Sequence, residues 1–272
     1  MARVGAARRL SSTRWTLDRP TVQGIRIIGA YSAILVLAEL VGATWGAIPG
    51  AMMDAVLIPV LLAHYVMRPA ATYRRLLPIL ALLGLLRTLS ITAVFPHLPV
   101  ATWYSLVGAP VLIGAVLAIR LIDEPFERLG LRVQDVRLDA AIVVSGLPLG
   151  LVGYVLLRPE ELVPGAGPAI VVLAMAALAV FAAFTEELVY RGLLQTVAIE
   201  AFGFRRAGVV YAATMCAFMY AGSGSPPFML AMWGLSLGFG FALVRGASLW
   251  GLAASHALIL WGMGIFWPRL LG

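Results

Sequence analysis

The chain of 272 residues is strongly apolar, with 61% hydrophobic and 12% charged residues, and its mean hydropathy is +0.95. This composition excludes an ordinary water-soluble domain and is typical of a polytopic membrane protein. The formal charge of +7 comes from arginine without any lysine. Because the arginines gather between apolar runs, we interpret them as topology signals and expect no nucleic acid partner.

The apolar runs are long and unbroken, which favours α-helices as the spanning elements. A bilayer core about 30 Å thick requires about 20 apolar residues per helix, and a helix satisfies its own backbone hydrogen bonds in lipid. The predicted fold is therefore all-α, a transmembrane helical bundle with about eight to nine membrane-spanning helices. In chain order we expect spans at about 24–45, 47–67, 76–95, 100–119, 140–157, 168–187, 207–221, 227–244 and 248–267.

The N-terminal residues 1–22 form a basic tail that contains five arginines and one acid. The apolar run that follows is long enough to span and has no clear cleavage motif, so we expect it to be retained as the first helix. Segment 68–75 carries three more arginines, whereas the turn 96–99 carries no arginine. The positive-inside rule then predicts a multi-pass protein of the cell (inner or plasma) membrane with a cytoplasmic N-terminus, embedded in the lipid bilayer.

Residues 120–138 are the one extended polar segment after the tail. Their charges recur at spacings that suit an amphipathic helix on the cytoplasmic surface. We expect this cytoplasmic linker to separate front transmembrane helices, residues 23–119, from a second transmembrane domain, residues 139–272.

Three charged residues lie inside the expected front spans, namely Glu39, Asp54 and Arg87. Unpaired charge is costly in a membrane, so the plain interpretation is that Arg87 pairs with one of the acids across the bundle. The alternative is a substrate or proton path. His64 and His97 lie near expected helix ends, where an interfacial or core role is favoured over metal ligation.

Two adjacent carboxylates, Glu186 and Glu187, follow a long run of Ala, Val and Leu. On a helix, Glu187 and Arg191 lie on one face and can pair. Glu186 lies on a different face and does not take part in this pair. Hydrolysis needs a general base for water and donors for the oxyanion, and Glu186 with His256 could supply two of these groups. Cys216 is the single cysteine, which excludes an intramolecular disulfide and favours a small buried side chain.

Four features occur in order: Glu186-Glu187-x-x-x-Arg191, the small-residue helix from Gly234 to Gly240, the stretch 245–250, and His256. Together they resemble the CPBP intramembrane proteases, which include CAAX prenyl proteases of the Rce1 type and abortive-infection-like proteins. The resemblance covers about residues 139–267. It implies that Glu186 acts as the base and that Arg191 holds Glu187.

The chain departs from this family at two motifs. The family has Phe-x-x-x-His, whereas Tyr220 or Gly222 stands at the histidine position here, depending on the register. The last motif is His-x-x-x-Asn or His-x-x-x-Asp, and here Leu260 follows His256. With a single histidine left, a zinc site with three protein ligands is poorly supplied, so we expect no metal and no cofactor. The candidate catalytic residues, vestigial if the chain is inactive, are Glu186, Glu187, Arg191, Tyr220 and His256.

The lost polar groups predict a CPBP-fold membrane protein that is catalytically impaired or inactive. Such a protein would act as a scaffold, chaperone or subunit for another integral membrane protein. The alternative is an active intramembrane endopeptidase of the CAAX type, with Glu186 as general base and Tyr220 replacing the histidine. A third class is a transporter or lipid-binding protein that uses Glu39, Asp54 and Arg87.

Overall fold

The computed structural model describes residues 22–69, 71, 73–92 and 98–272. Within these ranges all regular secondary structure is helical, which confirms the predicted all-α class. Seven of the described helices are long and apolar enough to cross a membrane, and a shorter apolar helix covers Leu76–Ser90. The chain is therefore a multi-pass membrane protein. The basic tail up to residue 21 and His97 lie outside the described residues, and the orientation in the membrane stays a prediction.

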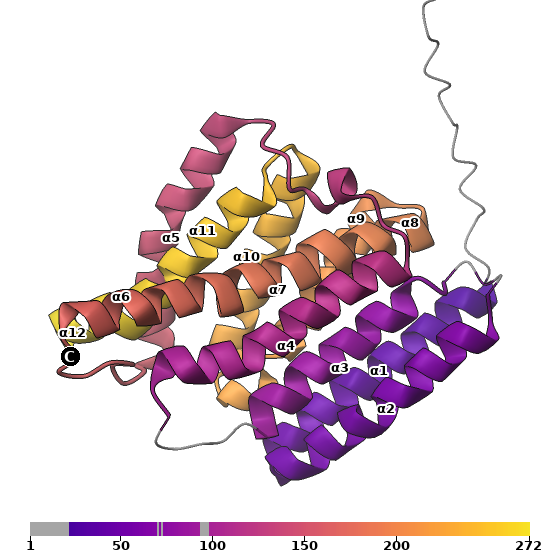
Figure 1. Ribbon diagram of the computed structural model, residues 1–272, viewed down its shortest axis with the longest axis horizontal. Helices are drawn as coiled ribbons and strands as arrows, with labels where there is room; N and C mark the ends of the chain where they lie inside the picture. The colour runs from indigo at the N-terminus through magenta and orange to yellow at the C-terminus, as the bar shows by residue number, and fades with distance from the viewer. Residues whose placement is uncertain (1–21, 70, 72, 93–97) are drawn as a thin grey trace, which may run out of the picture.

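The first four helices lie side by side as one group (Figure 1). Buried leucines such as Leu61, Leu76 and Leu80 fill the space between neighbouring helices of this group, and the same apolar core continues into the second half through Leu193 and Leu194. The front helices therefore share a core with the rest of the molecule. They are α1 (Val22–Trp45), α2 (Ala47–Met67), α3 (Leu76–Thr92) and α4 (Val100–Leu121).

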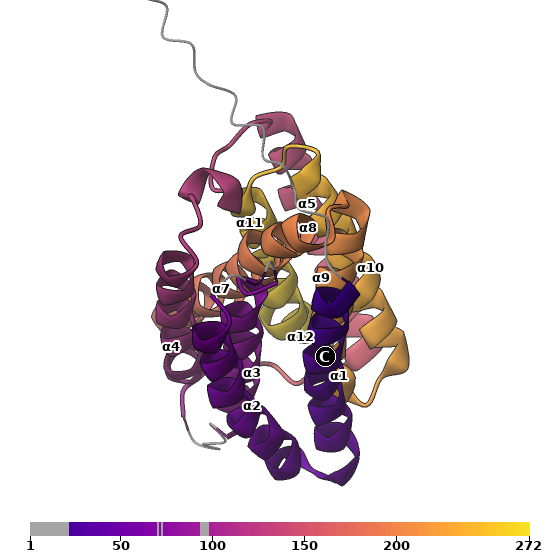
Figure 2. The same cartoon turned by 90° about the vertical axis from the view of Figure 1, so that its right-hand side faces the viewer.

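One long helical rod, residues 168–202, crosses the middle of the molecule. Figure 2 shows α7, its central part, between α3 of the front group and α11. The rod changes between α-helical and π-helical winding along its length. Its parts are α6 (Pro168–Ala177), η2 (Leu178–Phe184), α7 (Thr185–Glu187), η3 (Leu188–Gln195) and α8 (Thr196–Phe202), the two η segments being π-helical.

The remaining helices of the second half pack against this rod or against one another. They are α5 (Val136–Leu157), α9 (Arg205–Phe218), α10 (Pro226–Val244), α11 (Leu249–Trp261) and α12 (Trp267–Leu271), with a 3₁₀ turn η4 (Ala221–Ser223) and a π-helical segment η5 (Gly262–Phe266). The helix expected at about 207–221 is present as α9. With 14 residues, α9 is too short to be counted among the spanning helices.

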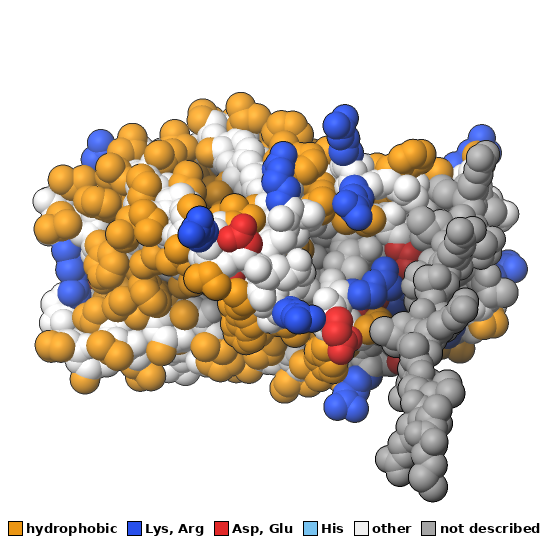
Figure 3. Space-filling view, turned by 90° about the horizontal axis from the view of Figure 1, so that it is seen from above, with side chains coloured by type: hydrophobic (Ala, Val, Ile, Leu, Met, Phe, Trp, Pro, Cys, Tyr) orange, Lys and Arg blue, Asp and Glu red, His pale blue; other side chains and the backbone are white. Residues whose placement is uncertain are grey.

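The polar segment 120–138 differs from its prediction. Instead of an amphipathic helix it holds one 3₁₀ turn, η1 (Phe126–Leu129). Pro125 precedes this turn and has no backbone N–H for a continuing helix, and Gly130 ends it with φ 75°. Glu124, whose side chain is fully buried, instead pairs with Arg75 and Arg128. On the face seen in Figure 3, arginine and acidic side chains lie between areas of hydrophobic side chains.

Hydrogen bonds tie this segment to the start of α11. The Leu249 N–H donates to the Gly130 carbonyl at 2.7 Å. The two oxygens of buried Asp139 accept from the backbone N–H and the hydroxyl of Ser248 at 2.7 and 2.6 Å, and the Ser248 Oγ accepts from the Gly251 N–H at 3.0 Å. Ser248 caps α11, so Asp139 fixes the position of the helix that carries the candidate histidine.

We expect Asp139→Ala to lower the free energy of unfolding by about 2–4 kcal/mol, because two donors of Ser248 lose their buried acceptor. Asp135→Ala is the matched control: Asp135 is an exposed cap of α5 that accepts from two backbone N–H groups, and its loss should cost about 1 kcal/mol. Unfolding of the detergent-solubilised protein measures both. Equal losses for the two variants would contradict the assigned role of Asp139.

Candidate active site at the glutamate pair

The two glutamates lie where the central rod changes its winding. They occupy α7, a short α-helical stretch between the π-helical segments η2 and η3. Two threonine hydroxyls bridge the widened turns: Thr185 donates to the Val180 carbonyl at 2.9 Å, and Thr196 donates to the Arg191 carbonyl at 3.3 Å. π-helical turns are rare and frequently occur at functional sites. The backbone therefore singles out the same stretch as the side chains do.

Glu187 is the central group of the site and is 1% exposed. Its Oε1 lies 2.9 Å from the His256 Nδ1, and its Oε2 lies 3.1 Å from the Arg191 Nε. Because a carboxylate only accepts hydrogen bonds, the Nδ1 of His256 is the donor. The expected pairing of Glu187 with Arg191 is present, and Glu187 also holds His256, a contact that sequence spacing alone did not predict.

Arg191 extends this network to two further helices. One terminal nitrogen donates to the Ser236 Oγ of α10 at 2.9 Å, and the other lies 3.8 Å from the Cys216 Sγ of α9. Cys216 is buried, as predicted. The buried ion pair is thus surrounded by polar partners, as a charge inside a bundle requires. Ser236 was missed from the sequence, where it is one small residue within a glycine-rich helix.

Glu186 lies on a different side of the helix and is only partly buried. Its Oε2 accepts a long hydrogen bond, 3.4 Å, from the Tyr220 hydroxyl. Tyr220 follows α9 and packs edge to face on Phe228, with 5.6 Å between ring centroids. The structure thus brings Tyr220 to Glu186, and both His256 and Arg191 to Glu187, so the five candidate residues form a pair and a neighbouring group of three.

Leu260, at the position where the related family has an amide or acid, packs in an apolar cluster with Leu178 and Ile265. In the glycine-rich helix α10, packing explains the glycine at position 240. A Cβ on Gly240 would lie 2.5 Å from the Gln195 Oε1, and the buried Gln195 Nε2 donates to the Gly240 carbonyl at 3.1 Å. Both positions therefore contribute packing and supply no group to the glutamates.

A metal ion does not suit the donors present. Both oxygens of Glu187 already have cationic or N–H partners, and a catalytic zinc site needs three protein ligands. Among the described residues, no group of three His, Cys, Asp or Glu side chains is placed to hold a metal ion.

An apolar cavity of about 570 Å³ lies beside the site, between α5, η2 and α11. Phe184 and Trp250 stack in its wall, with 5.0 Å between ring centroids. Ala257, next to His256, also lines it. No charged side chain takes part in this lining, so the cavity offers the glutamates an apolar neighbour and no further ligand.

Residues 168–261 match the protein-family model described as type II CAAX prenyl endopeptidase Rce1-like. The match begins at the first residue of α6 and ends at the last residue of α11, and it includes the five candidate residues. Searches of curated proteins and of solved structures returned no significant match.

We expect Arg191→Leu to lower the free energy of unfolding by about 3–5 kcal/mol, because Glu187 would remain buried without its guanidinium partner. Exposed Arg206 supplies the control, and Arg206→Leu should change stability by no more than about 0.5 kcal/mol. Adding Glu187→Gln to Arg191→Leu should recover part of the loss, since the unpaired charge is then removed. Denaturant titration in detergent measures all three, and a mild effect of Arg191→Leu alone would contradict the structural role of the pair.

Proposed function

Because residues 168–261 form an Rce1-like domain within a multi-pass membrane protein, we propose that this chain keeps the fold of that family without its peptidase activity. In this proposal it acts as a scaffold, chaperone or subunit for another integral membrane protein. The observation that carries the proposal is the division of the candidate residues: Tyr220 holds Glu186, while His256 and Arg191 hold Glu187.

Peptide hydrolysis requires a base that holds water and donors that stabilise the oxyanion. The partner of Glu186 is a tyrosine hydroxyl, which can donate to an oxyanion but is a poor base or metal ligand at neutral pH. His256 uses its Nδ1 on Glu187, and Leu260 adds no polar atom. Since a single such group is commonly worth about 10²–10³ in rate, the remaining set supports little or no hydrolysis.

The alternative function is an intramembrane endopeptidase of the CAAX type. The 3.4 Å contact between the Tyr220 hydroxyl and Glu186 favours it, because a base and an oxyanion donor would then lie side by side. In this case Glu186 activates water and Tyr220 stabilises the oxyanion. A direct cleavage assay decides between the two functions.

The glycine-rich helix α10 supports the binding of a partner. A Cβ added to Gly234 or Gly238 would meet nothing within 4 Å, and both glycines are exposed, as are Leu230 and Trp233 near them. Glycines four residues apart let two membrane helices approach closely. The outward face of α10 thus suits a transmembrane helix of another protein, whereas Gly240 faces the interior.

We expect wild-type protein and Glu186→Gln to give the same background rate of cleavage on a membrane-anchored CAAX-type peptide, because the remaining groups do not polarise a water molecule. Mass spectrometry of peptide products from reconstituted protein measures the rate. A wild-type rate more than about tenfold above that of Glu186→Gln would instead establish the endopeptidase, since removal of one catalytic group commonly has at least that effect.

We expect the double variant Gly234→Leu, Gly238→Leu to lose a membrane protein that co-purifies with the wild type after gentle solubilisation. The leucines would prevent close helix approach. Gly29→Leu is the control, because Gly29 of α1 is also exposed and also has nothing within 4 Å of an added Cβ. Quantitative mass spectrometry should find the same partner with wild type and control. A wild type that always purifies alone as a monomer would refute the scaffold proposal.

A further inference from the structure

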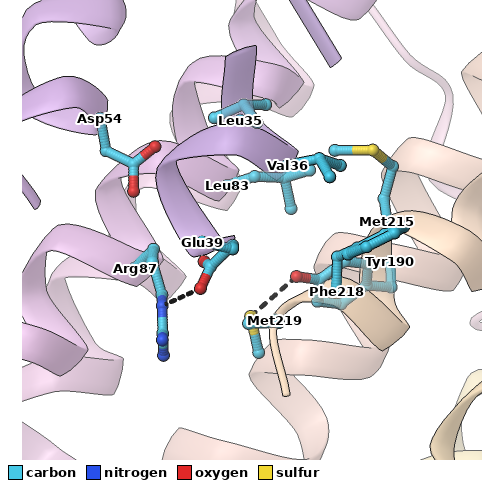
Figure 4. Close-up of a pocket in the computed structure, with 10 residues that line it drawn as sticks. All are labelled: Leu35, Val36, Glu39, Asp54, Leu83, Arg87, Tyr190, Met215, Phe218 and Met219. Atoms are coloured by element: carbon cyan, nitrogen blue, oxygen red, sulfur yellow. Dashed lines mark hydrogen bonds and ion pairs between the residues drawn. The ribbon is translucent and has the colours of Figure 1, made fainter. Parts of the chain in front are cut away.

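A second polar group of residues lies inside the front helices, away from the glutamate pair. Figure 4 shows Glu39 of α1, Asp54 of α2 and Arg87 of α3 around one small cavity. The Glu39 Oε2 lies 2.6 Å from the Arg87 Nε, which confirms the expected pairing of Arg87 with one acid. Asp54 is the acid left over.

Asp54 is enclosed more completely than any other charged residue of this group. It is 1% exposed, and its Oδ1 is buried without a hydrogen-bond partner among the residues that the structure describes. Its charge interacts with those of Arg87 and Glu39. A buried carboxylate oxygen without a partner is strongly unfavourable. Either the carboxylate is therefore neutralised, or its oxygen gains a hydrogen-bond partner.

Among the described residues that line the cavity, those from the other elements bring no positive charge. The central rod contributes Tyr190, whose hydroxyl donates to the Met219 sulfur at 2.8 Å. Helix α9 contributes Met215 and Phe218, and Met219 follows directly after it. His64 lies on α2 with Asp54 but about 15 Å further along the helix, where its two ring nitrogens contact the hydroxyls of Tyr31 and Tyr73.

The charges of the group do not balance when both acids are ionised. Two carboxylates and one guanidinium leave a net charge of −1 inside the bundle, which is costly. A divalent cation would need about six or more oxygen ligands, and no suitable group of three acidic, His or Cys side chains exists among the described residues. The cavity has a volume of about 20 Å³, room for one water molecule. A proton needs no such ligand cage.

We propose that Asp54 binds a proton at neutral pH and that the adjacent cavity holds one water molecule hydrogen-bonded to it. Glu39 forms the ion pair with Arg87, so the proton resides on Asp54, where the protonated oxygen donates to the water and the other oxygen accepts from it. The reaction is reversible protonation of one carboxylate, with no change of oxidation state. This intramembrane proton-binding site is independent of whether Glu186 is catalytic.

Infrared spectroscopy of the full chain in lipid vesicles tests the site, because a protonated buried carboxyl group has a C=O stretching band that a carboxylate lacks. All variants are made in a Glu186→Gln background, so that Glu186 cannot contribute to the band. The background protein should show the band near neutral pH, and the band should shift on transfer to D₂O and disappear in strongly alkaline buffer. The exposed-site variant Glu160→Gln should leave it unchanged.

Three substitutions then test how the band depends on the balance of charges in this group. Asp54→Asn should abolish the band, and Glu39→Gln should also abolish it, because Arg87 then neutralises the single remaining carboxylate. Arg87→Met should increase the band about twofold, since both acids would then lack a counter-charge and hold protons. Glu39→Gln and Arg87→Met keep the test decisive if Asp54→Asn does not fold.

The proposal is overturned if the background protein shows no such band near neutral pH, or if the band persists in folded Asp54→Asn. If the band is absent, and sodium or potassium ions raise the thermal stability of the background protein but not of Asp54→Asn, the site binds a metal cation instead of a proton.

Discussion

The arrangement of the second half depends on one buried carboxylate. Glu187 is held at one oxygen by the guanidinium of Arg191 and at the other by the imidazole of His256. Through Arg191 the same charge is connected to Ser236 of α10 and Cys216 of α9. Four parts of the chain therefore meet at a single ion pair, which would be costly to break because each charge lies in a medium that solvates it poorly.

The two polar groups inside the bundle are linked by adjacent residues of η3. Tyr190 lines the cavity beside Asp54, whereas Arg191 turns to Glu187. Arg87 of the front helices lies close to the segment that follows α9. Its terminal nitrogen would be 3.2 Å from a Cβ on Gly222, two residues beyond Tyr220. The front helices and the Rce1-like domain thus share polar residues as well as an apolar core.

Local patterns predicted much of this architecture. Hydropathy located the long helices, because a span needs a continuous apolar run, and helical spacing predicted the contact of Glu187 with Arg191. The balance of charge in the membrane predicted an acid partner for Arg87. These features depend on neighbouring residues or on a general cost of burial, so a single sequence contains the information.

Other features depended on contacts between distant parts of the chain. The charge spacing of residues 120–138 suggested a helix, but Pro125 and Gly130 limit it to one turn. The hydrogen bonds from Ser248 to Asp139 join residues 109 positions apart, and no local pattern indicates them. The π-helical winding around the glutamates was likewise not predicted, and neither was the choice of His256 for Glu187.

The bonds that hold the start of α11 have a consequence for where this protein can be divided. The acceptors for Leu249 and Ser248 are Gly130 and Asp139, and both precede the segment 168–261 that matches the family model. A recombinant fragment cut at the edges of that match would begin α11 without its acceptors. A fragment that keeps both acceptors must start at or before residue 130, so the edges of the family match leave out residues that position α11.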